Sequence, residues 1–111
     1  MPVSQTPQGL LVEYTEPSTT KTGTPLTDLD HTTIFFDLGS GPQKAVDVPA
    51  TSANGGGAIS QVIQVPVGAD QEADVSITVT ATDTSGNEST PSNSVAVRVD
   101  TLPPASPVLS A

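Results

Sequence analysis

Hydrophobic and polar residues alternate along several short stretches of this chain, and no stretch shows a helical period. The clearest alternation is VSITVTA, residues 75–81, in which Val75, Ile77 and Val79 are separated by Ser and Thr. A period of two places successive side chains on opposite faces of an extended backbone and predicts a half-buried β-strand. Comparable stretches predict further strands at residues 9–15, 32–38, 58–67 and 94–100, and a weaker one at 44–48.

Turn-forming residues separate these stretches. Gly, Pro, Asn and Ser gather at residues 18–31, 39–42 and 49–57, and an acidic loop occupies residues 68–74. Each predicted strand has one apolar face and one face rich in Thr and Ser, and β-branched side chains suit a pleated surface. We therefore expect an all-β fold, an antiparallel two-sheet sandwich of about seven strands.

The domain boundaries follow from the same pattern. Residues 9–100 are predicted to form the sandwich. Residues 1–8 show little apolar alternation, so we expect an N-terminal arm that lacks a strand. Residues 101–111 are rich in Pro and continue past the last predicted strand as a C-terminal arm, which can add to a sheet edge.

The charge and the absence of cysteine exclude several classes of partner and of binding site. Twelve acidic residues against three basic ones give a formal net charge of −9. Nucleic acids and anionic membranes are therefore poor partners, since neutralising phosphate requires Lys and Arg. The chain has no Cys, which excludes disulfides and thiolate metal sites. It shows neither an apolar run long enough to span a bilayer nor the basic start and apolar stretch of an export signal.

Catalytic chemistry is hard to assemble from these residues. The chain has no Cys nucleophile, and its single His31 lies in a loop of Thr and Asp without a serine elbow. We therefore expect no enzymatic activity, no catalytic residue and no cofactor. Asp28, Asp30 and His31 could share calcium with Asp70 or Asp74, although a solvated acidic loop is the favoured interpretation.

The stretch TATDTSGNES, residues 80–89, interrupts two runs of β-formers. Asp83 and Asn87 could form a calcium ligand pair, but turn chemistry explains them better, because an Asp at the start of a turn accepts backbone hydrogen bonds and Gly86 tolerates left-handed φ. The tripeptide Asn87-Glu88-Ser89 fits a glycosylation acceptor, which matters only in a eukaryotic secretory pathway. We predict a turn here and no metal site in the chain.

Two segments resemble a known family. They are TGTPLTDLDHTTIFFDLGSG, residues 22–41, and VTATDTSGNESTPSNSVAVRVDTLPPASP, residues 79–107. Both resemble fibronectin type III modules, immunoglobulin-like β-sandwiches common in bacterial and bacteriophage surface proteins, and the likeness covers roughly residues 9–107. The chain departs from the family pattern where Tyr14 stands in place of a tryptophan and Val75 in place of a tyrosine.

Four residues are candidates for a protein interface: Phe35, Leu102, Val108 and Leu109. Phe35 is out of phase with its core-facing neighbours, so it either lies in an interface or is buried beneath the loop at residues 49–57. The other three lie in residues 102–111, which we expect to add to a sheet edge of this molecule or of a neighbour. The alternative is a linker, since PPASPVLSA also looks like the opening of another module.

These observations favour a non-enzymatic structural or interaction module. The resemblance implies a bacteriophage virion protein, a capsid decoration or a tail or neck accessory, which docks on neighbouring capsid or tail subunits. Self-assembly through the C-terminal arm is an open alternative. Such a protein is made in the host cytoplasm and ends in the virion. The alternative is a spacer or adhesive module of a longer secreted bacterial surface protein or polysaccharide-degrading enzyme, located outside the cell or on its surface. Carbohydrate binding is weakly supported, because the chain has only three aromatic residues.

Overall fold

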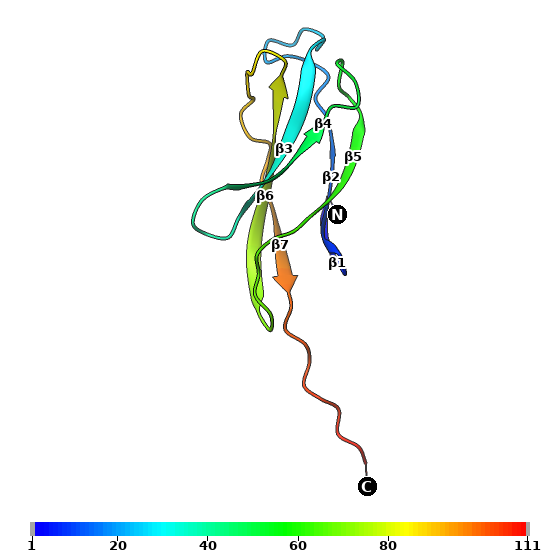
Figure 1. Ribbon diagram of the computed structural model, residues 1–111, viewed down its shortest axis with the longest axis vertical. Helices are drawn as coiled ribbons and strands as arrows, with labels where there is room; N and C mark the ends of the chain where they lie inside the picture. Colours follow the sequence, from blue (N-terminus) through cyan, green and yellow to red (C-terminus); the bar gives the residue numbers. More distant parts are fainter. Residues whose placement is uncertain (1, 111) are drawn as a thin grey trace.

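The computed structural model describes residues 2–110, and within them it contains seven strands and no helix. The strands pack as two antiparallel sheets, one with the order β1-β2-β5 and the other with the order β4-β3-β6-β7 (Figure 1). The predicted all-β, two-sheet sandwich is therefore confirmed. The strands are β1 (Val3–Thr6), β2 (Gly9–Thr15), β3 (Leu29–Asp37), β4 (Gln43–Pro49), β5 (Ala58–Ile63), β6 (Glu72–Asp83) and β7 (Val95–Asp100).

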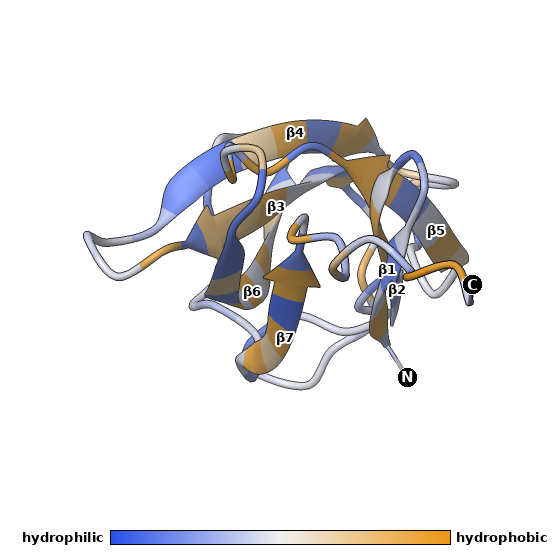
Figure 2. Ribbon diagram, turned by 90° about the horizontal axis from the view of Figure 1, so that it is seen from below, coloured by the Kyte–Doolittle hydropathy of each residue, from blue (hydrophilic) through white to orange (hydrophobic). Residues whose placement is uncertain are grey.

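The core between the sheets consists mainly of Val, Ile and Leu. Ile34 is completely buried, and Val75 and Ile77 of β6 are nearly so, which confirms the predicted phases of the two central strands. Bands of apolar and polar colour alternate along β7, as its sequence predicts (Figure 2). Phe36 is the only aromatic residue in the buried cluster of the described chain, and Tyr14 packs at its margin.

The structure corrects the N-terminal boundary. Residues 3–6, expected to belong to an arm without a strand, form β1 and pair with β2 from Val12 to Gly9. Val3 inserts into the core with 2% of its surface exposed, and the turn at Pro7-Gln8 returns the chain into β2. Val3 is the only buried side chain of this four-residue strand, so its sequence shows no alternation of apolar and polar residues.

Three loop boundaries also shift. β3 begins at Leu29, inside the predicted loop 18–31, because Leu29 is buried and its N–H donates to the carbonyl oxygen of Ala53 at 2.9 Å. β6 begins at Glu72, inside the predicted acidic loop, where it pairs with the end of β7. β5 ends at Ile63, before Pro66, which cannot donate to a ladder.

Residues 101–110 form no strand and extend away from the sandwich below β7 (Figure 1). Val108 and Leu109 are 93% and 95% exposed, and Leu102 is 50% exposed. The expected addition of this segment to a sheet edge of the same molecule is therefore wrong for the described residues. A proline-rich sequence with three N–H groups missing pairs poorly along its own length and favours this extended form. Addition to a neighbour stays a prediction.

Candidate functional site

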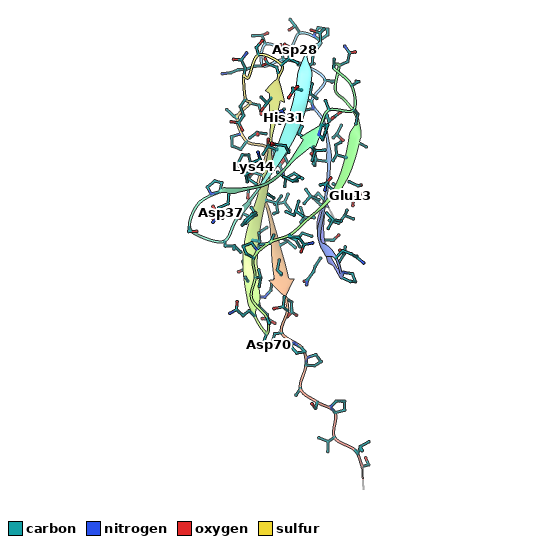
Figure 3. All side chains as sticks on the ribbon, viewed as in Figure 1. Glu13, Asp28, His31, Asp37, Lys44 and Asp70 are labelled. Atoms are coloured by element: carbon teal, nitrogen blue, oxygen red, sulfur yellow. The ribbon has the colours of Figure 1, made fainter. Side chains whose placement is uncertain are left out.

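The acidic residues considered for calcium lie at opposite ends of the sandwich. Asp28 lies at the pole where β6 ends, and Asp70 lies at the other pole, before β6 begins (Figure 3). β6 has twelve residues, which separate the two by about 40 Å at the usual rise of a strand. The hypothesis that Asp28, Asp30 and His31 share an ion with Asp70 or Asp74 is therefore wrong.

His31 is instead engaged locally. Its Nδ1 lies 2.7 Å from Oδ2 of Asp30, and its Nε2 lies 3.9 Å from Oδ1 of Asp47. Lys44 Nζ lies 2.5 Å from the other oxygen of Asp47, and the pKa of Asp47 is lowered by hydrogen bonds from Lys44 and Thr33. Within residues 2–110 no group of three or more His, Cys, Asp and Glu side chains has the arrangement of a metal site.

The Asp83 cluster closes a turn. Asp83 Oδ1 accepts hydrogen bonds from the N–H groups of Ser85 and Asn87 at 3.0 and 2.9 Å, and Oδ2 accepts one from the Asn87 amide at 3.0 Å. These hydrogen bonds lower the pKa of the Asp83 carboxyl, and the bond from the Asn87 side chain has the largest effect. Both carboxylate oxygens thus serve donors of the turn, as the turn interpretation of residues 80–89 requires.

Glu16 is a buried carboxylate that the sequence did not single out. Only 2% of its surface is exposed, and it accepts hydrogen bonds from Thr51 N–H at 2.9 Å, Thr51 Oγ1 at 2.5 Å and Gly57 N–H at 3.0 Å. Burial acts to raise the pKa of Glu16, but these bonds outweigh it, and the pKa lies below its ordinary value. Glu16 therefore anchors the glycine-rich loop between β4 and β5.

Phe35 lies on the outer face of the larger sheet. It is half-buried, between Lys44 of β4 and Thr78 of β6 in the strand register. The loop at residues 49–57 packs against Leu29, six residues away along β3, or about 20 Å. Burial of Phe35 beneath that loop is therefore wrong, and its role in an interface stays a prediction.

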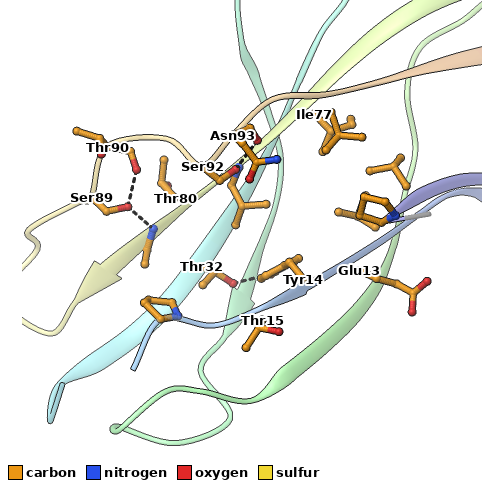
Figure 4. A pocket seen from close by; sticks show the side chains of 17 residues that line it. Glu13, Tyr14, Thr15, Thr32, Ile77, Thr80, Ser89, Thr90, Ser92 and Asn93 are labelled. Carbon is orange, nitrogen blue, oxygen red and sulfur yellow. Dashed lines mark hydrogen bonds between the residues drawn. The ribbon is translucent and has the colours of Figure 1, made fainter. Parts of the chain in front are cut away.

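A groove of about 490 Å³ opens between the two sheets, on the side where β1 and β7 run (Figure 4). Val79 and Ala81 of β6 line it beside Tyr14 of β2, and its rim carries hydroxyl and amide side chains. The rim residues are Thr15, Ser89, Thr90, Ser92 and Asn93. Glu13 is the only charged residue among its described lining.

The groove exists because β1 and β7 each cover only half of a longer partner strand. β1 pairs with β2 up to Val12, and β7 pairs with β6 up to Ile77. In that covered half, the Gln5 side chain joins the two sheets: its Nε2 donates to the Asp100 carbonyl at 2.8 Å, and its Oε1 accepts from the Asp100 N–H at 3.0 Å. Beyond Val12 of β2 and Ile77 of β6, toward the ends of those two strands, no strand of residues 2–110 covers the gap between the sheets.

Residues 88–93 form the wall of the groove beside β6. Ser89 Oγ accepts the N–H of Ala81 at 2.9 Å, and Ser92 Oγ accepts that of Val79 at 2.9 Å. The N–H groups of the same two serines donate to the Ala81 and Val79 carbonyls at 2.7 and 2.8 Å. The serine side chains therefore complete a ladder beside Pro91, which has no N–H of its own.

At the floor of the groove, Tyr14 OH and Thr32 Oγ1 lie 2.6 Å apart and connect the two sheets. Burial raises the pKa of Tyr14 above its ordinary value, against the opposing effect of the Thr32 hydrogen bond, and the nearby Glu16 raises it further.

Sequence reasoning missed the groove, Gln5 and Glu16. The signals for them were weak: a lone Gln between polar neighbours, a Glu before Pro17, and two serines three residues apart in a loop. The predicted residues Phe35, Leu102, Val108 and Leu109 do not meet in one place, since Phe35 lies on the sheet face and the others on the extended segment. Searches among family models, curated proteins and solved structures find no match for this chain.

Proposed function

We propose that this protein is a non-enzymatic interaction module of a larger assembly, and that residues 102–110 are its docking segment. The observation that carries this is the contrast between the segment and the sandwich. The sandwich is acidic and rich in hydroxyl groups on its surface, whereas the segment exposes Val108 and Leu109 almost completely and carries no charge. Exposed large apolar side chains that cluster on one segment mark a contact with another protein.

The assembly we favour is a bacteriophage virion, in which the module decorates a capsid or accompanies the tail or neck. The resemblance to fibronectin type III modules motivates this choice. The strand order supports the resemblance and not the virion itself. The fourth strand lies beside the third in the same sheet, whereas immunoglobulin constant domains place their fourth strand in the opposite sheet. A net charge of −9 keeps free subunits apart and soluble until they dock.

The second proposal is a spacer or adhesive module of a longer secreted bacterial protein. One observation favours it: Pro107-Val108 repeats the Pro2-Val3 pair that opens β1. In a tandem array, residues 107–110 would then begin the first strand of a following module.

One experiment separates the two. Virus particles from a producing culture are banded on a density gradient, their proteins are quantified by mass spectrometry, and their structure is determined by electron cryo-microscopy. The virion proposal expects the chain in fixed copy number per particle, at sites that repeat with the lattice. Its recovery only as part of a longer polypeptide in the culture medium would refute the virion proposal in favour of the spacer.

A further inference from the structure

The groove has one wall whose backbone lacks a partner. The N–H of Glu13 donates to the carbonyl of Pro2 at 2.7 Å, but Pro2 has no N–H to return to Glu13, so the ladder between β1 and β2 stops there. Alternate residues of a strand direct their backbone groups to the same side, so the N–H and C=O of Thr15 face the same open side. Within residues 2–110 this edge of β2 therefore leaves the C=O of Glu13 and the N–H and C=O of Thr15 for an added strand.

The other wall cannot accept one, because Ser89 and Ser92 already satisfy the facing edge of β6. An added strand would thus pair with β2 on one side, and its alternate side chains would lie over Val79 and Ala81 in the groove. The occupant should be extended and apolar. The part of the partner that enters the groove should also be uncharged, since Glu13 is the only charged group in the described lining.

Residues 102–110 of a second copy have this chemistry. The segment LPPASPVLS carries no charge, is extended, and exposes Leu102, Val108 and Leu109. Its Pro107-Val108 pair repeats Pro2-Val3, the pair with which β1 enters the core beside this groove. Val3 is 2% exposed there, which shows that a valine after proline fits the space between the sheets.

The positions of the segment and the groove suit a contact between successive copies. The segment leaves the pole at which β7 ends, whereas the groove opens toward the opposite pole, near Pro17 and Thr90 (Figures 1 and 4). The nine residues 102–110 span at most about 30–32 Å when fully extended, so the segment can extend past the pole of its own sandwich toward a copy stacked below. The segment would run in the direction of β1, antiparallel to β2.

We infer that residues 102–110 of one copy add as a strand to the Glu13–Thr15 edge of the next copy, with Val108 or Leu109 in the groove, so that copies associate head to tail. Such a contact is heterologous and builds a row or a ring. The inference rests on the proposed function and names one of its partners, a second copy of the chain.

Because the chain has no Cys, disulfide cross-linking tests the contact directly. Chains carrying T15C are mixed with chains carrying V108C or L109C under mild oxidation. Residues opposite one another in an antiparallel pair have Cβ atoms about 4.5–5.5 Å apart, and alternation turns one of the two cysteines toward Thr15. We expect a heterodimer with one of V108C and L109C, and a ladder of oligomers from a chain that carries both cysteines of that pair.

The matched control is V62C, at an exposed apolar position of β5 away from the groove. Equal cross-linking of the tail cysteines to V62C, or none to T15C, would overturn the inference. So would a double-cysteine chain that closes only on itself, since the segment would then dock in its own groove.

A second measurement avoids cysteine chemistry. Sedimentation velocity over a range of concentrations should show association of the native chain. Of V108D and L109D, the one that replaces the side chain in the groove should weaken association about tenfold or more, because it removes a large apolar side chain from the contact. T15P, which deletes the free N–H, should weaken association to a similar degree. V62D, which adds the same charge elsewhere, should leave it within about twofold.

The failure of this inference differs from that of the proposed function. If particles carry the chain but T15C never reacts with the tail of a neighbour, the module docks on another subunit and the inference is wrong. If T15C cross-links to the tail but no particle contains the chain, the contact stands and the virion proposal is wrong.

Discussion

Replacing Glu16 tests how a buried carboxylate holds the pole of the sandwich. Glu16 accepts three hydrogen bonds from Thr51 and Gly57, and its side chain is almost fully buried. E16Q preserves the shape, but it removes the charge and turns an amide NH₂ toward one of the donors. Hydrogen bonds to charged groups contribute about 1.5–3 kcal/mol each and are not additive, so we expect E16Q to lower the free energy of unfolding by about 2 kcal/mol at neutral pH.

The loss should depend on pH in a defined direction. The pKa of Glu16 in the folded chain lies below the ordinary 4.5, so its ionised form stabilises the fold above that value. This stabilisation is lost as the pH falls from about 4.5 through the folded pKa. The difference in unfolding free energy between the native chain and E16Q should therefore be largest near pH 7 and should shrink at acid pH.

Urea denaturation of both chains at pH 7 and at pH 3 measures this difference. The matched control is E13Q, because Glu13 lies on the same strand but is exposed, with one long contact of 3.4 Å to Ser60 Oγ. E13Q should change the stability by less than about 0.5 kcal/mol. An E16Q chain as stable as the native one at pH 7, or a loss of equal size at both pH values, would refute the anchoring role.

Three further predictions concern single residues. G55A should lower the unfolding free energy by about 2 kcal/mol or more in thermal or urea melts, because Gly55 has φ of +66° and an added Cβ would lie 1.9 Å from the carbonyl oxygen of Pro17. The control is G23A, which has φ of +87° and open space around it and should lower the unfolding free energy by about 1 kcal/mol. Equal losses for the two variants would contradict this account. Tyr14 is the only tyrosine, so ultraviolet titration should show its phenol ionising above the ordinary pKa of 10.0. The unfolding free energy should fall as the pH rises past 10.0, because the folded chain keeps the phenol protonated longer than the unfolded chain does. An ordinary titration would mean that the ring is not held in the groove floor. Q5A should cost about 1 kcal/mol and speed hydrogen exchange at the Asp100 amide, and an unchanged exchange rate there would show that the Gln5 pair does not hold the seam.

The sequence predicted the strands that carry several apolar residues, because alternation over six or more residues is hard to produce by chance. The phases of β3, β6 and β7 were read correctly for this reason. β1 was missed because Val3 is its only buried apolar residue and the rest of the strand is held by backbone pairing, which leaves no mark in the side chains.

The candidate site was less predictable for a related reason. The groove depends on where two strands stop relative to their partners, and register is a property of pairing that one strand's sequence does not contain. Glu16 and Gln5 act through contacts with residues 35 and 95 positions away, so their local sequence carries no signal. The apolar residues at 102, 108 and 109 were recognisable as exposed interface candidates because no predicted strand could bury them.

The central claim, that residues 102–110 dock on a neighbouring protein, is tested most directly by hydrogen exchange in the assembly. The segment has amide groups at Leu102, Ala105, Ser106, Val108, Leu109 and Ser110. In the isolated chain at low concentration the five amides from Ala105 to Ser110 should exchange as in an unfolded peptide, because this part forms no strand and is exposed, whereas the Leu102 N–H donates to Oδ1 of Asp100 at 2.9 Å. In the assembled particle the amides around Val108 should be protected by at least about tenfold, and unprotected amides there would contradict the account.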